Sequence, residues 1–147
     1  MSAYEVLAEI SAWTSLAYRQ GRLLSGIIYL YNRRLAGLKT WDSPPGLEMF
    51  QKLWGPSALQ NVLLTTTQWS KVSPELMRDC DKKLWGEIGT KGAAIERFMG
   101  TRESGLELID KLMTKEPKSL LIQDQMVENN MALAETDAGR YLSSKYQ

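Results

Sequence analysis

The sequence predicts an α/β fold of three layers, in which a short parallel sheet of about three strands lies between helices. Two stretches, residues 26–31 and 62–67, are nearly continuous runs of apolar and β-branched residues. Strands with helices on both faces have this pattern, whereas a half-exposed strand alternates apolar and polar residues. Helical patterns precede, separate and follow the two runs, and this alternation favours parallel strands joined by right-handed crossovers.

Length and charge limit the classes of protein. At 147 residues the chain has the length of one domain, and we expect a single module over 1–147. Its expected parts are an N-terminal helix (1–20), a core of alternating strands and helices (21–115), and a C-terminal helix and tail (116–147). The formal net charge of +1 gives no reason to expect nucleic acid as a partner. No apolar run approaches the roughly 18 residues of a membrane span.

Two residue types are informative through their scarcity. The chain has no histidine, which excludes Ser-His-Asp triads, histidine general bases and nearly all catalytic zinc sites. The single cysteine, Cys80, cannot form an internal disulfide. Because the first residues also lack the pattern of a secretory signal, we expect a cytoplasmic protein.

The first half of the chain reads as helix, strand, loop and helix. A helix is expected over 3–19, with an apolar face that consists of Val6, Ile10, Trp13 and Leu16 or Ala17. A strand over 24–31 follows. The loop over 32–46 carries Arg33 and Arg34, and its length suggests a functional role or disorder. The next helix, over 47–54, ends at Gly55–Pro56.

The second half continues the alternation. A strand over 61–67 leads to a helix that begins at Ser73 and ends near Gly86. A third strand is expected over 93–99, then a helix from about 103 with its apolar face at 106, 109 and 112 or 113. The last helix is expected over 117–131, with Leu120, Leu121, Val127 and Met131 on its apolar face, and the polar tail from Ala132 is expected to fray. The inward face of the helix after Ser73 comprises Leu76, Cys80 and Leu84.

Three strands are few for a doubly wound sheet. A strand of the buried type that is left at an edge exposes unpaired backbone groups and tends to pair with another strand. We therefore expect a protein partner, or a second copy of this chain, at the outer side of the first strand.

Four blocks along the chain carry a family resemblance. They are GRLLSGIIYL at 21–30, MFQKLWG at 49–55, NVLLTTTQW at 61–69 and GTRES at 100–104, and the tail over 121–139 adds to them. In this order they resemble the second half of fungal AIG-type GTPases, P-loop proteins similar to the immunity-associated and septin-like GTPases. The resemblance implies that the three strands are the fourth to sixth of a six-stranded G domain.

The resemblance also implies what this chain lacks. The phosphate-binding loop and the magnesium-holding Asp of that family would precede Met1. No GxxxxGK[ST] motif is present, and the segment most similar to it, residues 37–40, lacks the first glycine of the motif. We therefore expect no GTP hydrolysis by this chain alone, and no cofactor unless a missing half supplies a site for GTP or GDP with Mg²⁺.

By resemblance, the base-binding residues fall in two places. The guanine-specificity motif aligns with Thr67, Gln68, Trp69 and Ser70. Ser70 stands where the family has an Asp that accepts both guanine N–H groups, and it can accept only weakly. The last base-contacting loop aligns with Gly100 and Thr101, followed by Arg102.

Each of these residues also has a purely structural interpretation. Arg33 and Arg34 are candidates for phosphate or partner contacts, yet paired arginines on a loop are often simply solvated. Trp69 can stack on a base or pack against a helix, and Thr101 can serve as a helix N-cap. Two functions therefore remain open: a truncated interaction module without catalysis, and a nucleotide-binding protein whose phosphate-binding half lies upstream or in a partner chain.

Overall fold

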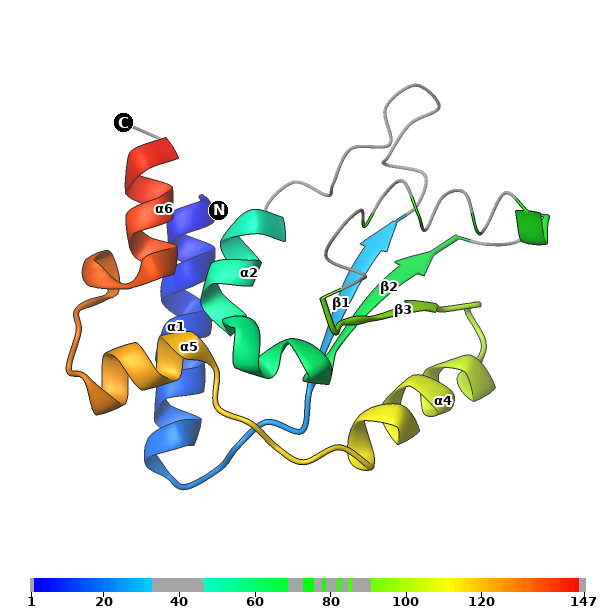
Figure 1. Cartoon of the computed structure of the whole chain (residues 1–147), viewed down its shortest axis with the longest axis horizontal. Helices are drawn as coiled ribbons and strands as arrows, with labels where there is room; N and C mark the ends of the chain where they lie inside the picture. Colours follow the sequence, from blue (N-terminus) through cyan, green and yellow to red (C-terminus); the bar gives the residue numbers. More distant parts are fainter. Residues whose placement is uncertain are drawn as a thin grey trace. The chain divides into compact units, whose positions relative to one another are not determined.

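The computed structural model of the chain is shown in Figure 1. It describes residues 2–32, 47–68, 73–75, 78, 82, 85 and 91–145. The chain forms two compact units, the first comprising Met1–Leu24, Gly46–Ala58 and Pro117–Gln147, and the second Ser25–Pro45 and Leu59–Glu116. The expectation that 1–147 act as one module stays a prediction.

The second unit contains a parallel sheet of three strands. The strands are β1 (Ile27–Asn32), β2 (Val62–Thr67) and β3 (Ala94–Arg97), in the order β1-β2-β3. The α/β class and the small parallel sheet predicted from the sequence are therefore confirmed. The central strand β2 is buried from Val62 to Thr66, which explains its continuous apolar and β-branched sequence. The first strand starts three residues later than the expected position 24.

Helix α4 (Arg102–Met113) covers one face of this sheet. Its Leu108 and Leu112 pack on Leu63 of β2, with Ile28 and Ala94 of the outer strands around them. The lack of a side chain at Gly26 makes room for this contact. A Cβ at Gly26 would lie 2.3 Å from Leu112 Cδ2.

The predicted inward face of α4 was largely wrong. Leu112 is buried as expected, but Leu106, Ile109 and Met113 are 46%, 49% and 69% exposed. The helix carries apolar residues on two sides, and periodicity alone does not say which side meets the sheet. The ion pair between Lys111 Nζ and Glu96 Oε2 of β3, 2.6 Å long, fixes one flank of the helix beside β3.

An aromatic pair lies on the other face of the sheet. Tyr29 of β1 meets Trp85 edge to face, with ring centroids 6.0 Å apart and an interplanar angle of 79°. Burial raises the pKa of the Tyr29 hydroxyl to about 12, so this side chain stays neutral at physiological pH. Within the helix expected after Ser73, the positions Leu76, Cys80 and Leu84 lie outside the described residues.

The first unit is built from helices. The elements are α1 (Ala3–Arg19), α2 (Leu47–Trp54), the 3₁₀-helix η2 (Pro56–Asn61, whose end enters the second unit), α5 (Leu121–Gln123), the π-helix η4 (Asp124–Glu128), the 3₁₀-helix η5 (Leu133–Glu135) and α6 (Asp137–Lys145). Helices α1 and α2 both pack against α5 and α6. Leu7, Trp54 and Ile122 are among the side chains buried in this unit. The predicted bounds of α1 and α2 are confirmed.

The predicted inward face of α1 was partly wrong, although Val6, Ile10 and Ala17 are half-buried. The buried positions are Leu7, Ser11, Thr14 and Ser15, whereas Trp13 is 66% exposed and Leu16 is 55% exposed. The small hydroxyl side chains can be buried because they bond to the helix itself. Thr14 Oγ1 donates to the Ile10 carbonyl at 2.7 Å, and Ser11 Oγ donates to the Ala8 carbonyl at 3.0 Å.

The C-terminal expectations also needed correction. The single helix expected over 117–131 is a short α-helical turn followed by the π-helix η4, and Met131 lies beyond both. The tail from Ala132 does not fray, because α6 forms and buries Ala138, Gly139 and Leu142. Among the helices within the described ranges, none combines the length and the apolar character needed to cross a bilayer.

Candidate functional site

The carboxyl ends of the three strands lie at one edge of the sheet. Asn32, the last residue of β1, is the register partner of Thr67, the last residue of β2. Thr66 is likewise paired with Arg97 at the end of β3, and the N–H of Phe98 donates to the Thr66 carbonyl at 2.8 Å. Ligands of open parallel sheets bind outside such strand ends, so the residues that follow β2 and β3 form the candidate site.

The segment after β2 holds the first set of predicted base-binding residues. Thr67 is half-buried, and Gln68 is exposed with a backbone φ of 67°, a conformation that few residues other than glycine adopt. The chain therefore turns sharply where the guanine-specificity motif aligns. Trp69 and Ser70 lie outside the described residues, as do Arg33 and Arg34 after β1.

The segment after β3 is held by two interlocking hydroxyl groups. Thr101 Oγ1 accepts a hydrogen bond from the Ser104 N–H at 3.1 Å, which makes Thr101 the N-cap of α4. Ser104 Oγ in turn accepts from the Met99 N–H at 2.9 Å. Gly100 precedes this cap with φ +80°. The structural interpretation of Thr101 is thus confirmed for its side chain.

Sequence reasoning missed the role of Ser104. Ser104 lies in the first turn of α4, just after the loop that the resemblance had assigned to base contact, and it is 8% exposed. Thr101 is an N-cap residue type, but Ser104 is not the Glu or Gln that completes a capping box, so no local pattern pointed to its bond with the Met99 N–H.

The loop after β3 has backbone donors that remain available. Within the described part of the chain, the N–H groups of Gly100 and Thr101 make no hydrogen bond. Arg102, the first residue of α4, is exposed at the same end of β3, so the edge offers amide and cationic contacts. Groups of these kinds are suited to binding a ligand. No cluster of metal-ligating side chains occurs among the residues that the structure describes.

A second candidate surface lies at the outer side of β1, and we call it the edge surface. It comprises Leu30 of β1, which is 59% exposed, and the exposed Leu106, Ile109 and Met113 of α4. Leu30 and Ile28 point to the sheet face that α4 covers, because alternate residues of a strand share a face. Since Lys111 faces β3, the opposite flank of α4, with Ile109, lies on the β1 side.

Comparisons with known proteins give no match. No family model matches the sequence, and neither the curated proteins nor the solved structures contain a significant relative.

Proposed function

We propose that this chain is a degenerate, truncated GTPase-like module that lacks a phosphate-binding loop and acts as a protein-interaction or regulatory domain. The edge surface carries the proposal. In the ladders that the structure describes, β1 pairs on one side only, with β2. Its sequence, IIYLYN, contains none of the charged residues or prolines that normally protect an edge strand.

The exposed stripe of α4 supports the same proposal. A strand added beside β1 would lie under Ile109 and Met113, so that apolar side chains of the partner would cover them. Backbone hydrogen bonds supply affinity in this kind of strand addition, and side-chain contacts supply specificity. In such a complex the outer edge of β1 would provide the backbone hydrogen bonds, and the side chains of the edge surface would provide the apolar contacts.

The Leu30→Lys variant tests this function. A photo-crosslinking amino acid at position 109 is expected to capture a partner protein in cells that make the full chain. Leu30→Lys should lower the crosslink yield about tenfold, because an ammonium group would have to be buried beside the added strand. The yield is measured by mass spectrometry of the adduct.

Leu23→Lys is the matched control, because Leu23 is 46% exposed but lies outside the edge surface. It should leave the yield unchanged. Equal yields with Leu30→Lys and wild type would contradict the proposal.

The second candidate function is guanine-nucleotide binding, with the phosphate-binding half supplied upstream or by a partner chain. The available N–H groups of Gly100 and Thr101 beside the end of β2 favour it. The resemblance supports it through Thr67, Gln68, Trp69 and Ser70. Loss of the Asp that the family has at position 70 removes a charged hydrogen bond, which is worth about 1.5–3 kcal/mol.

Calorimetric titration with GDP and with GTP–Mg²⁺ tests this candidate. On this candidate we expect weak GDP binding by the wild-type chain and an affinity ten- to about a hundredfold higher for Ser70→Asp. Ser70→Asn is the control, because its neutral amide cannot supply the charge. Tight, magnesium-dependent binding by the wild type would contradict the interaction module without a phosphate site.

A further inference from the structure

The outward side of α1 carries a regular set of residues that the proposed function does not use. Glu5, Ala8, Ala12, Leu16 and Arg19 follow one another at spacings of three or four and therefore share one face of the helix. All are exposed except Ala8, which is half-buried. We call this set the α1 outer face.

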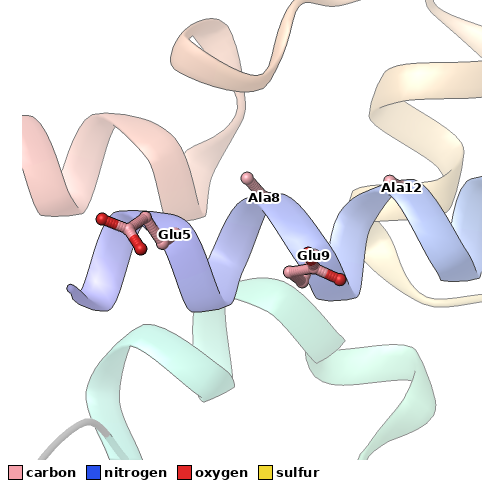
Figure 2. Close-up of a pocket in the computed structure, with 4 residues that line it drawn as sticks. All are labelled: Glu5, Ala8, Glu9 and Ala12. Atoms are coloured by element: carbon pink, nitrogen blue, oxygen red, sulfur yellow. The ribbon is translucent and has the colours of Figure 1, made fainter. Parts of the chain in front are cut away.

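The α1 outer face has a hollow at its N-terminal half. The hollow has a volume of about 320 Å³ and is lined by Glu5, Ala8, Glu9 and Ala12 (Figure 2). The two alanines form its floor because they have the smallest side chains on this side of the helix. A leucine-sized side chain from a neighbouring helix would fit over them.

Large apolar side chains border the hollow on the same helix. Leu16 is 55% exposed and Trp13 is 66% exposed, while the buried residues of α1 are Leu7, Ser11, Thr14 and Ser15. A helix in a monomer normally directs its large apolar residues inward. Exposure of Trp13 and Leu16 beside a hollow therefore indicates a face that another helix covers.

We propose that the α1 outer face binds the same face of a second copy of this chain, with the two helices antiparallel and a two-fold axis at Ala12. In this arrangement Leu16 lies over the partner's Ala8, in the hollow, and the reciprocal contact occurs on the other side of the axis. Ala12 meets the partner's Ala12, and the small side chains allow the helices to approach closely. Trp13 is about 100° around the helix from Ala12, so it borders the seam.

The charges at the two ends of the α1 outer face indicate that its binding partner is a second copy of this chain. The acidic Glu5 lies at one end of the α1 outer face and Arg19 at the other. Antiparallel pairing about Ala12 places Glu5 beside the partner's Arg19, and does so twice. Parallel pairing would instead bring like charges together. Such self-complementarity is what a two-fold interface requires.

The expected affinity is modest. Helix α1 has 17 residues and is therefore about 25 Å long. One helix pair of this length lies at the small end of specific interfaces, so we expect a dissociation constant of about 10 µM.

Sedimentation velocity of the full chain over a range of concentrations tests the proposal. The wild type should reach twice its monomer mass of 16.7 kDa. Leu16→Glu should weaken the dimer at least about tenfold, because it places a carboxylate beside the partner's Glu5 and Glu9. Leu23→Glu, at a leucine outside α1, should leave the mass unchanged.

A charge exchange tests the antiparallel register. Glu5→Arg and Arg19→Glu should each weaken the dimer about tenfold, and the double variant should restore it. Circular dichroism of each variant controls for loss of the fold.

Three results would overturn the proposal. The first is a wild-type chain that stays monomeric at about 100 µM, ten times the expected dissociation constant. The second is a Leu16→Glu variant that still forms the dimer. The third is a double charge-exchange variant that does not regain association. A dimer that dissociates with Leu30→Lys but not with Leu16→Glu would overturn this inference and support the edge surface instead. The two surfaces lie on separate elements, so failure of one leaves the other standing.

Discussion

The Gly139→Ala variant is expected to unfold with a free energy about 2 kcal/mol lower than that of the wild type. A Cβ at this position would lie 2.0 Å from the Leu133 carbonyl oxygen and 2.9 Å from the Leu133 carbonyl carbon. Both atoms belong to the backbone, so α6 and the turn at Leu133 would have to separate. Overpacking of this kind costs about 1–3 kcal/mol, which outweighs the gain of up to about 1 kcal/mol from replacing a helical glycine.

Gly105→Ala provides the matched control. Gly105 lies in α4, and a Cβ there would meet only the Phe98 side chain at 3.5 Å, an ordinary contact. The same substitution should therefore stabilise the second unit by about 0.5–1 kcal/mol. Urea denaturation followed by circular dichroism measures both variants. If Gly139→Ala and Gly105→Ala changed the free energy of unfolding in the same direction, the steric explanation would be wrong.

The bounds of several elements could be predicted because they depend on local signals. Helices α1 and α2 and strand β2 begin and end where capping residues, Gly55–Pro56 and the apolar run indicate. The parallel sheet followed from strands without alternation. These signals lie within a few residues of the element that they define.

The inward faces of helices were predicted less well, because they depend on residues far away in the sequence. Helix α4 places Leu108 and Leu112 against the sheet, because Leu63 packs on them and Gly26 leaves room for Leu112. Helix α1 can bury Thr14 because Gln123, more than a hundred positions later, meets its carbonyl. Periodicity gives the residues that share a face, but not the partner of that face.

The C-terminal helix illustrates the same limit. The side-chain Nε2 of Gln125 donates to Asp137 Oδ1 at 2.9 Å, and its side-chain Oε1 accepts from the Asp137 N–H at 3.1 Å. These bonds hold the start of α6 from twelve residues away. The polar composition after Ala132 suggested fraying, because the bonds to Gln125 cannot be predicted locally and the local cap, in which Thr136 Oγ1 accepts from the Gly139 N–H at 3.1 Å, was overlooked.

The candidate site was predictable in part. Thr67 ends β2, and Gln68, Gly100 and Thr101 come after two adjacent strands whose carboxyl ends meet. The use of the Thr101 hydroxyl in a cap could not be separated from ligand contact by sequence alone, because the same residue type serves both purposes. The roles of Trp69 and Ser70 stay predictions.

The Gln123→Met variant is expected to lower the free energy of unfolding by about 3 kcal/mol. Gln123 has no solvent exposure. Its Oε1 accepts from the Leu120 N–H at 2.8 Å, and its Nε2 donates to the Thr14 carbonyl at 3.0 Å. Methionine has a similar length but leaves both backbone groups without these partners, and buried polar groups that lose their hydrogen bonds cost about 1–3 kcal/mol each.

Gln125→Met is the comparison that isolates burial as the cause. Gln125 is itself only 9% exposed and also makes two hydrogen bonds, one to the Asp137 carboxylate, whose side chain is 43% exposed, and one with the Asp137 N–H. Water can replace the lost bonds there, so we expect a cost of only about 1 kcal/mol. Urea denaturation of the two variants measures the difference. Equal losses would show that the number of hydrogen bonds lost, and not their burial, determines the cost.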